Sequence, residues 1–191
     1  MIRIRGGKVV RKQENLPVRL GLCQALTYFL SPLLPMPTMT TLFAKIDTYL
    51  VETAQRQPAV SAASVGWHLD HSLRVIQQVS QALAHSEPTA YRWRFHLARS
   101  YVLLRGDFPR GRARAPQSVV PQQEPTVASL RAQVAEARQA WQALRELPRN
   151  SWFPHPYFGP LNRSMTERFL VVHTRHHLRI VRDILRKADQ S

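Results

Sequence analysis

Prolines and helix-capping residues divide the chain from Thr38 onward into segments that have helical periodicity. In residues 40–55 apolar side chains recur at spacings of three and four, which places Leu42, Ile46 and Leu50 on one face of a helix. Proline ends such segments because it lacks the amide hydrogen that a helix interior needs. The predicted helices cover residues 38–57, 61–83, 89–104, 126–147 and 162–187, with the second starting at Ser61 or Ser64 and the last at Asn162 or Ser164.

Two long connections separate these helices. Residues 106–125 contain four prolines and cannot form a regular helix, and residues 148–162 form a second proline-rich loop. No segment alternates between apolar and polar residues, so no sheet is predicted. Hydrophobic residues make up 44% of the 191 residues, which is enough for one domain with a proper core. The sequence therefore predicts an all-α bundle of four helices, with an extra helix and long loops, over residues 38–191.

Residues 1–37 are predicted to be an N-terminal extension. Six basic side chains and Glu14 precede Leu20, and an apolar run broken by prolines follows. This run is short for a membrane span and lacks a small-x-small cleavage site, so neither a transmembrane helix nor a signal peptide is favoured. We favour either a loosely attached extension or a start codon assigned too far upstream, with Met36 or Met39 as the true first residue.

The predicted last helix carries His173, His176 and His177. With about 100° per residue, His173 and His177 lie at the centre of an apolar stripe that includes Phe169 and Ile180, and His176 lies at its edge. Two imidazoles on a buried face cost free energy unless a metal ion, hydrogen bonds or water satisfy their nitrogens. A histidine pair at this spacing can bind one ion, but zinc-like sites need a third protein ligand. The opposite side, predicted to face water, carries Arg168, Arg175, Arg182 and Arg186.

The predicted second helix offers His68 and His71 as candidates for that third ligand. His71 belongs to a stripe with Trp67 and Val75, about 120° from the main apolar face of the helix. The helix is therefore predicted to be covered on two sides. His68 lies between the two stripes, and periodicity alone does not choose between the two histidines.

The histidine pattern leads to a family resemblance. A four-helix core with a histidine on its second helix and His-x-x-x-His on its last resembles the DinB-like superfamily, which includes YfiT-like metal hydrolases and S-transferases that use bacillithiol, mycothiol or glutathione. Residues 64–76, 108–116 and 155–180 are similar to an uncharacterised DinB-like branch, and the resemblance spans about residues 39–187. It implies one divalent ion bound by His71, His173 and His177, with His68 as the alternate ligand.

Such a ligand set defines the chemistry to expect. Three neutral imidazoles leave the ion its full charge and an open position. A water there can lose its proton near neutral pH, or a cofactor thiol can bind as the thiolate. We expect a metal-dependent hydrolase or thiol S-transferase, with zinc, nickel, iron and manganese all compatible. The alternative is a stress-related DinB-like scaffold that binds a metal or ligand without turnover.

Two loops are candidates for binding the substrate. Arg110, Arg112 and Arg114 could hold a carboxylate or phosphate, although a solvated basic loop has the same sequence. His155 and Tyr157 leave a proline-rich turn shortly before the last helix, and would either reach the mouth of a cleft or pack the loop onto the bundle.

Charge and cysteine content bound the partners and the compartment. The formal net charge is +15, but the basic residues are spread over several segments, and the densest cluster includes a single aromatic residue, Phe108. Nucleic-acid binding is therefore the least favoured function, and a small-molecule substrate or thiol is the expected partner. A homodimer is compatible with the sequence. The single Cys23 excludes an internal disulfide and fits a cytoplasmic location.

Overall fold

A computed structural model describes residues 36–110 and 116–190. By its internal contacts the chain divides into residues 1–35 and 36–191. Most of the predicted N-terminal extension lies outside the described residues, as do Arg112 and Arg114. None of the described helices has the length and apolar character needed to cross a membrane.

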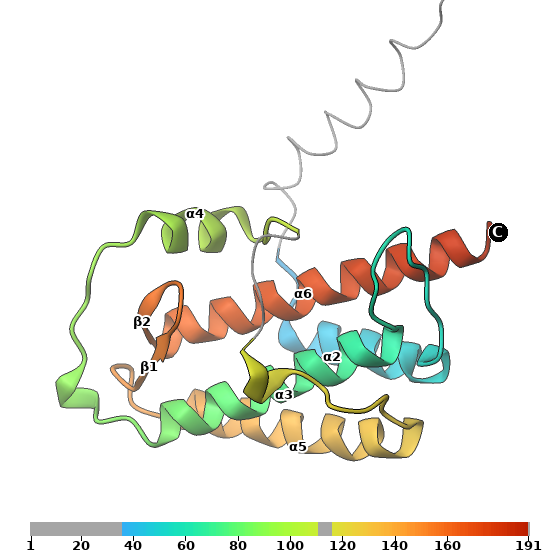
Figure 1. Ribbon diagram of the computed structural model, residues 1–191. Coiled ribbons are helices and arrows are strands. Elements are labelled where there is room, and N and C mark those ends of the chain that lie inside the picture. The colour runs from blue at the N-terminus through green and yellow to red at the C-terminus, as the bar shows by residue number, and fades with distance from the viewer. Residues whose placement is uncertain (1–35, 111–115, 191) are drawn as a thin grey trace, which may run out of the picture. The chain divides into compact units, whose positions relative to one another are not determined.

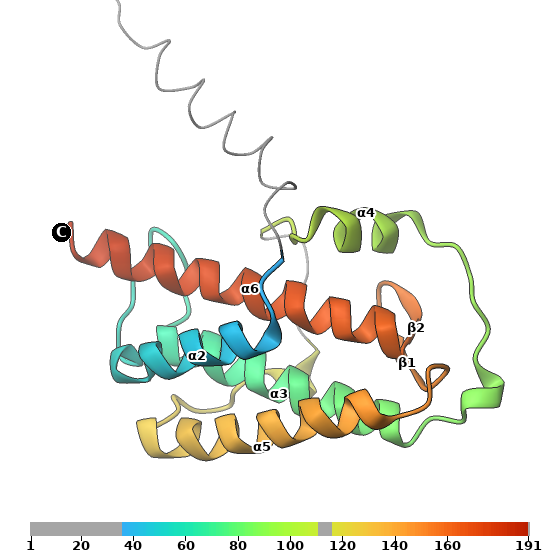
Figure 2. The same ribbon diagram turned by 180° about the vertical axis from the view of Figure 1, so that it is seen from behind.

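Four helices form the bundle, which confirms the predicted all-α fold (Figure 1). They are α2 (Met39–Tyr49), α3 (Val65–Ala84), α5 (Val127–Glu146) and α6 (Arg163–Ala188). Helix α3 packs most extensively against α5 and α6, and α2 packs against α6 and α5. The extra helix α4 (Leu97–Arg105) lies outside the bundle and contacts α6 (Figure 2).

Each bundle helix begins at a capping residue that is among the candidates in the sequence. The side-chain oxygen of the capping residue accepts a hydrogen bond from the backbone N–H three residues later, which satisfies one of the four free donors of the first turn. The capping residues are Thr38, Ser64, Thr126 and Asn162. Local hydrogen bonding therefore fixes these helix starts.

The first helix is shorter than predicted. Helix α2 ends at Tyr49 and one 3₁₀ turn follows (Leu50–Glu52), so the predicted extension to Pro58 is wrong. The next carbonyls serve another helix, because Thr53 O accepts from Gly66 N and Gln55 O from Val65 N, both at 2.9 Å. These bonds satisfy donors in the first turn of α3.

The third predicted helix is wrong in its first half. Residues 88–90 form a 3₁₀ turn, residues 91–96 have no regular structure, and α4 begins only at Leu97. The buried guanidinium of Arg99 explains this, because it donates to the carbonyls of Arg94, Phe158 and Pro160. A tertiary contact thus holds a segment that local propensity would make helical.

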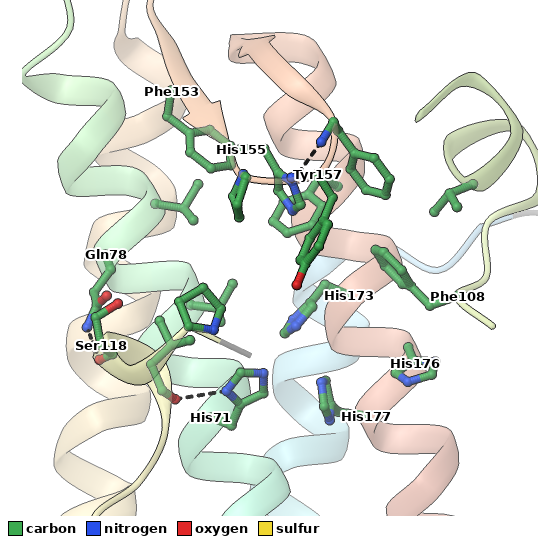
Figure 3. Close-up of a pocket in the computed structure, with 18 of the residues that line it drawn as sticks. His71, Gln78, Phe108, Ser118, Phe153, His155, Tyr157, His173, His176 and His177 are labelled. Atoms are coloured by element: carbon green, nitrogen blue, oxygen red, sulfur yellow. Dashed lines mark hydrogen bonds between the residues drawn. The ribbon is translucent and has the colours of Figure 1, made fainter. Parts of the chain in front are cut away.

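The loop before α6 contains a two-stranded antiparallel sheet, which the sequence analysis excluded. Strand β1 (Trp152–His155) pairs with β2 (Gly159–Asn162). Strands of four residues are too short to show alternation, and Pro154 lies opposite Pro160. Figure 3 shows Phe153, His155 and Tyr157 of this hairpin at one end of a pocket between α3 and α6.

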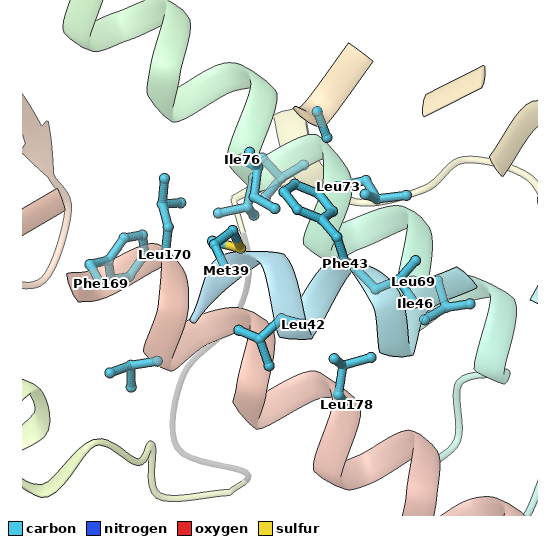
Figure 4. Close-up of a cluster of buried hydrophobic side chains, with 14 of the residues drawn as sticks. Met39, Leu42, Phe43, Ile46, Leu69, Leu73, Ile76, Phe169, Leu170 and Leu178 are labelled. Carbon is cyan, nitrogen blue, oxygen red and sulfur yellow. The ribbon is translucent and has the colours of Figure 1, made fainter. Parts of the chain in front are cut away.

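The hydrophobic core lies between α2, α3, α5 and α6, and Figure 4 shows the part where α2, α3 and α6 meet. Leu42, Leu73 and Leu170 are fully or almost fully buried there. The buried face of α6 is wider than predicted. The side of this helix that carries four arginines was predicted to face water, but it is partly covered. Arg182 and Arg186 are exposed, whereas Arg168 and Arg175 donate to Leu103 O and Met36 Sδ.

A glycine at position 106 leaves room for Met36, whose Sδ contacts Arg175. Gly106, the C-cap of α4, has φ +68°, and a Cβ added there would lie 2.8 Å from Met36 Sδ. Gly159 has φ +69°, but a Cβ added there would have no neighbour within 4 Å. We expect Gly159→Ala to lower the free energy of unfolding by about 1–2 kcal/mol because of the positive φ. Gly106→Ala should cost more, because Met36 must also move.

Urea denaturation of the two variants measures this difference. Adding Met36→Ala should bring the cost of Gly106→Ala down to that of Gly159→Ala, as a double-mutant cycle would show. Equal costs of the two glycine substitutions in the presence of Met36 would mean that the contact carries no energy.

Candidate metal centre and its pocket

Three histidines from two helices converge at one point (Figure 3). His71 comes from α3, and His173 and His177 come from adjacent turns of α6. One ring nitrogen from each residue lies within 4.8 Å of the others, and the ring centroids are 4.6–5.1 Å apart. Side chains separated by about a hundred positions in the sequence thus form one group that could hold a metal ion.

The orientation of His71 is fixed by its surroundings. Its Nδ1 lies 2.8 Å from the carbonyl oxygen of Val119, which can only accept, so Nδ1 carries the hydrogen. Trp67 stacks on the ring at a centroid distance of 5.0 Å. The unprotonated Nε2 of His71 is therefore the atom available to a metal ion, an arrangement typical of metal-binding histidines.

His68 supports the site as a neighbour of a candidate ligand. Its Nδ1 lies 3.0 Å from Nδ1 of His177, and its Nε2 lies 3.0 Å from Oγ of Ser61. One consistent arrangement has His177 donating to His68 and His68 donating to Ser61. Nε2 of His177 then keeps its lone pair for a metal ion. The structure thus places His68, the alternate ligand of the sequence analysis, behind His177.

His173 has a buried polar atom without a partner. Its Nδ1 is inaccessible to solvent and has no hydrogen-bond acceptor or donor among the described residues. A buried unsatisfied nitrogen costs about 1–3 kcal/mol. A ring without hydrogen bonds can turn either nitrogen toward an ion. The donor set of three imidazoles, one of them unsatisfied, fits a divalent metal ion.

The environment keeps these imidazoles neutral. Burial lowers the pKa of His71, His173 and His177 below the ordinary value, and the neighbouring histidines lower it further for all three. For His71 the hydrogen bond to Val119 and the charge of Asp70 partly oppose that shift. Because a metal ligand must be deprotonated, the rings are in the binding-competent state at neutral pH.

His176 is outside this group, as the helix geometry predicts. Its ring faces Phe108, and its Nδ1 lies 3.7 Å from the carboxylate of Asp107. Asp107 also pairs with Arg179 at 2.9 Å. His176 therefore lines the pocket beside the three-histidine group and serves as a natural control for it.

The three histidines lie at one end of a pocket of about 640 Å³. Helix α3, helix α4, the β1–β2 hairpin, α6 and the loops at Phe108 and Val119 all contribute to its wall. The hairpin end holds His155 and Tyr157, which both line the pocket (Figure 3). His155 also stacks on Phe158 and accepts from two backbone N–H groups, so it both reaches the pocket and packs the loop.

The described arginine of the basic loop is engaged elsewhere. Arg110 pairs with Asp183 at 2.7 Å, and it is not among the described residues that line the pocket. Binding of an anionic substrate by Arg110, Arg112 and Arg114 stays a prediction. Asp70 is buried, and its carboxylate accepts hydrogen bonds from Arg74 and Gln133.

Some residues of the site have no signal in the sequence. Val119 contributes a backbone carbonyl from a proline-rich loop, and Ser61 belongs to the connection before α3. Backbone acceptors cannot be recognised from residue type. The sequence did contain one indirect signal, the second apolar stripe of α3 with Trp67 and His71. This stripe predicted that a second part of the chain packs on this helix.

Removing His68 tests its supporting role. We expect His68→Ala to weaken metal binding by about 10–100-fold, because His177 loses the acceptor that fixes its tautomer. His68→Gln, whose amide oxygen can accept the same hydrogen, should retain part of the affinity. Competition with a chelating dye measures both, with His85→Ala, an exposed histidine of the same region, as the control. Equal affinity of wild type and His68→Ala would contradict the role.

Comparison with known proteins identifies the family of the chain. The family model of the DinB superfamily matches residues 39–181, which include the four bundle helices up to Val181 and all three histidines of the candidate metal centre. Neither a search of curated proteins nor a search of solved structures gave a match. The match extends over well more than half of the chain, and the chain therefore belongs to the DinB superfamily.

Proposed function

We propose that the chain is a metal-dependent enzyme, a hydrolase or a thiol S-transferase, that acts on a small molecule in the pocket. The observation that carries the proposal is the convergence of His71, His173 and His177 within 4.8 Å at one end of that pocket. A buried histidine cluster in a concave, mostly apolar site is a common setting for catalysis.

The chain's own residues have separate tasks in this proposal. His71, His173 and His177 would hold the ion, while Val119 O and His68 keep the nitrogens of His71 and His177 directed toward it. A divalent ion held by these three neutral imidazoles would lower the pKa of a bound water or thiol and so supply a nucleophile at neutral pH. Aromatic walls around the histidines exclude bulk water and orient the substrate.

The first test is metal content. Protein purified without added metal and reloaded separately with zinc, nickel, manganese or ferrous iron should bind one ion per chain, measured by elemental analysis after gel filtration. The His71→Ala and His177→Ala variants should bind less than one tenth of that amount. No stoichiometric metal in the wild type under any loading condition would refute the proposal.

The second test separates the reactions. The loaded protein is assayed with ester and amide substrates alone, and with electrophiles in the presence of bacillithiol, mycothiol or glutathione. Hydrolysis without thiol identifies a hydrolase, and thiol-dependent consumption of the electrophile identifies an S-transferase. Metal binding without turnover in either series would favour a DinB-like scaffold that binds a ligand.

A further inference from the structure

The wall of the pocket is built from apolar side chains of separate elements. Helix α3 contributes Val75 and Val79, and α4 contributes Val102. Aromatic rings close the rest, with Phe108 and Phe158 stacked at a centroid distance of 6.1 Å and Phe169 edge-on to both. Each ring is held by its neighbours, so the apolar surface is preformed. Such a wall gains free energy only by contact with apolar ligand atoms.

The polar groups on the described part of this wall are neutral or already paired. Gln78 Nε2 donates to the carbonyl of Ser118 at 2.6 Å, and His155 Nδ1 accepts from the backbone N–H groups of Tyr157 and Phe158. The three-histidine group lies at one end of the pocket, and His155 and Tyr157 lie at the hairpin end. Between these two ends the lining is mostly apolar.

Three described arginines that are next to pocket-lining residues in the chain, or bonded to their neighbours, have partners of their own. Arg110 pairs with Asp183, and Arg179 pairs with Asp107. Arg99 is buried, and its guanidinium donates to three backbone carbonyls. An anionic ligand buried against this wall would therefore lose its hydration without gaining one of these arginines, which is costly.

We infer that the pocket binds a neutral, largely apolar molecule, whose reactive group faces the histidines and whose body lies against the aromatic wall. If the chain is the proposed enzyme, this molecule is its substrate, so this part of the inference rests on the proposed function. Binding to the wall itself requires no metal. A volume of about 640 Å³ suits a ligand with one or two rings.

Two fluorescent probes with one skeleton test the inference. N-phenyl-1-naphthylamine is neutral, and 8-anilinonaphthalene-1-sulfonate is the same diarylamine with an added sulfonate. In titrations of the full-length, chelator-treated protein, we expect the neutral probe to bind at least about tenfold more tightly, because the sulfonate must be desolvated. Tighter binding of the sulfonate probe would overturn the inference. If that tighter binding were then lost in an Arg112→Gln, Arg114→Gln double variant, the pocket would be assigned to an anionic ligand.

Matched variants locate the bound probe. Val79→Glu places a carboxylate on the wall and should reduce binding of the neutral probe at least about tenfold. Ala82→Glu does the same at an exposed position that lines the pocket, in case Val79→Glu destabilises the fold. Ala84→Glu, two residues further along α3 and outside the pocket, is the control. Unchanged affinity in both wall variants would show that the probe binds elsewhere.

A variant that acts from outside the pocket wall distinguishes this inference from the proposed function. His68 lies behind His177 and is not among the described residues that line the pocket. His68→Ala should weaken metal binding about 10–100-fold but keep affinity for the neutral probe within about threefold. Probe binding in a chain that binds no metal would support the apolar pocket and refute the metalloenzyme. Metal binding without affinity for the neutral probe would support the metal centre and refute the apolar pocket.

Discussion

Replacing His173 by leucine is expected to abolish stoichiometric metal binding while leaving the metal-free protein as stable as the wild type or more stable. Loss of one of three protein ligands should weaken binding by at least about a thousandfold, beyond the 10–100-fold typical of residues that only orient a ligand. The free energy of unfolding of the metal-free variant should be equal to that of the wild type or higher by about 1 kcal/mol.

The second half of this expectation follows from the surroundings of His173. Its Nδ1 is buried without a partner among the described residues, so the folded protein carries the cost of desolvating it. Leucine has a similar volume and no polar atom, and it extends the apolar stripe formed by Phe169 and Ile180. A residue retained at a cost in stability is typical of a functional site.

The histidine at the edge of the stripe provides the matched control. His176 is on the same helix and lines the same pocket, but it is outside the three-histidine group. His176→Leu should keep one metal ion per chain. Elemental analysis and urea denaturation of the metal-free proteins measure the two effects separately. A large loss of stability in His173→Leu, with metal content unchanged, would identify His173 as an ordinary core residue.

The metal-free protein is expected to lose stability as the pH falls from about 6.5 to 4. Burial lowers the pKa of His68 to about 4, with the nearby charges of His71, His176 and Arg110 adding to the effect. Burial also lowers the pKa of His155 to about 4. In the unfolded chain these groups take up protons near pH 6.5, while the folded protein keeps them neutral.

The sign follows from proton linkage. Between pH 6.5 and 4 the unfolded state binds more protons than the folded state, so the free energy of unfolding rises with pH and is lost as the pH falls. For His68 alone, the difference between 6.5 and about 4 corresponds to on the order of 3 kcal/mol. His71, His173 and His177, whose pKa values are also lowered, act in the same direction.

Urea denaturation of chelator-treated protein at pH 7.0, 6.0, 5.0 and 4.5 measures this loss. His68→Gln should flatten the dependence by about one proton, and His85→Gln replaces an exposed histidine as the control. A free energy of unfolding that stays constant from pH 7.0 to 4.5 would show that the imidazoles are protonated equally in both states.

The helices were predictable where their signals are local. Thr38 and Thr126 cap helices at the predicted starts, and Ser64 and Asn162 are each one of the two predicted alternatives, because a capping bond spans only three residues. The end of α2 and the non-helical segment before α4 were not predictable, because groups distant in the sequence bond to the backbone there. Thr53 and Gln55 leave the helical pattern to bond the start of α3, and Arg99 draws the carbonyl of Arg94 out of it.

The candidate site shows the same division. The sequence by itself determined that His173 and His177 share the buried stripe of the last helix and that His176 does not, because helical geometry is fixed by the backbone. The family resemblance, not periodicity, preferred His71 over His68. Only the tertiary structure brought His71 to the other two rings, placed His68 behind His177, and set Val119 O against His71. Those contacts depend on how α3, α6 and a proline-rich loop pack, and packing is a property of the whole chain rather than of any one segment.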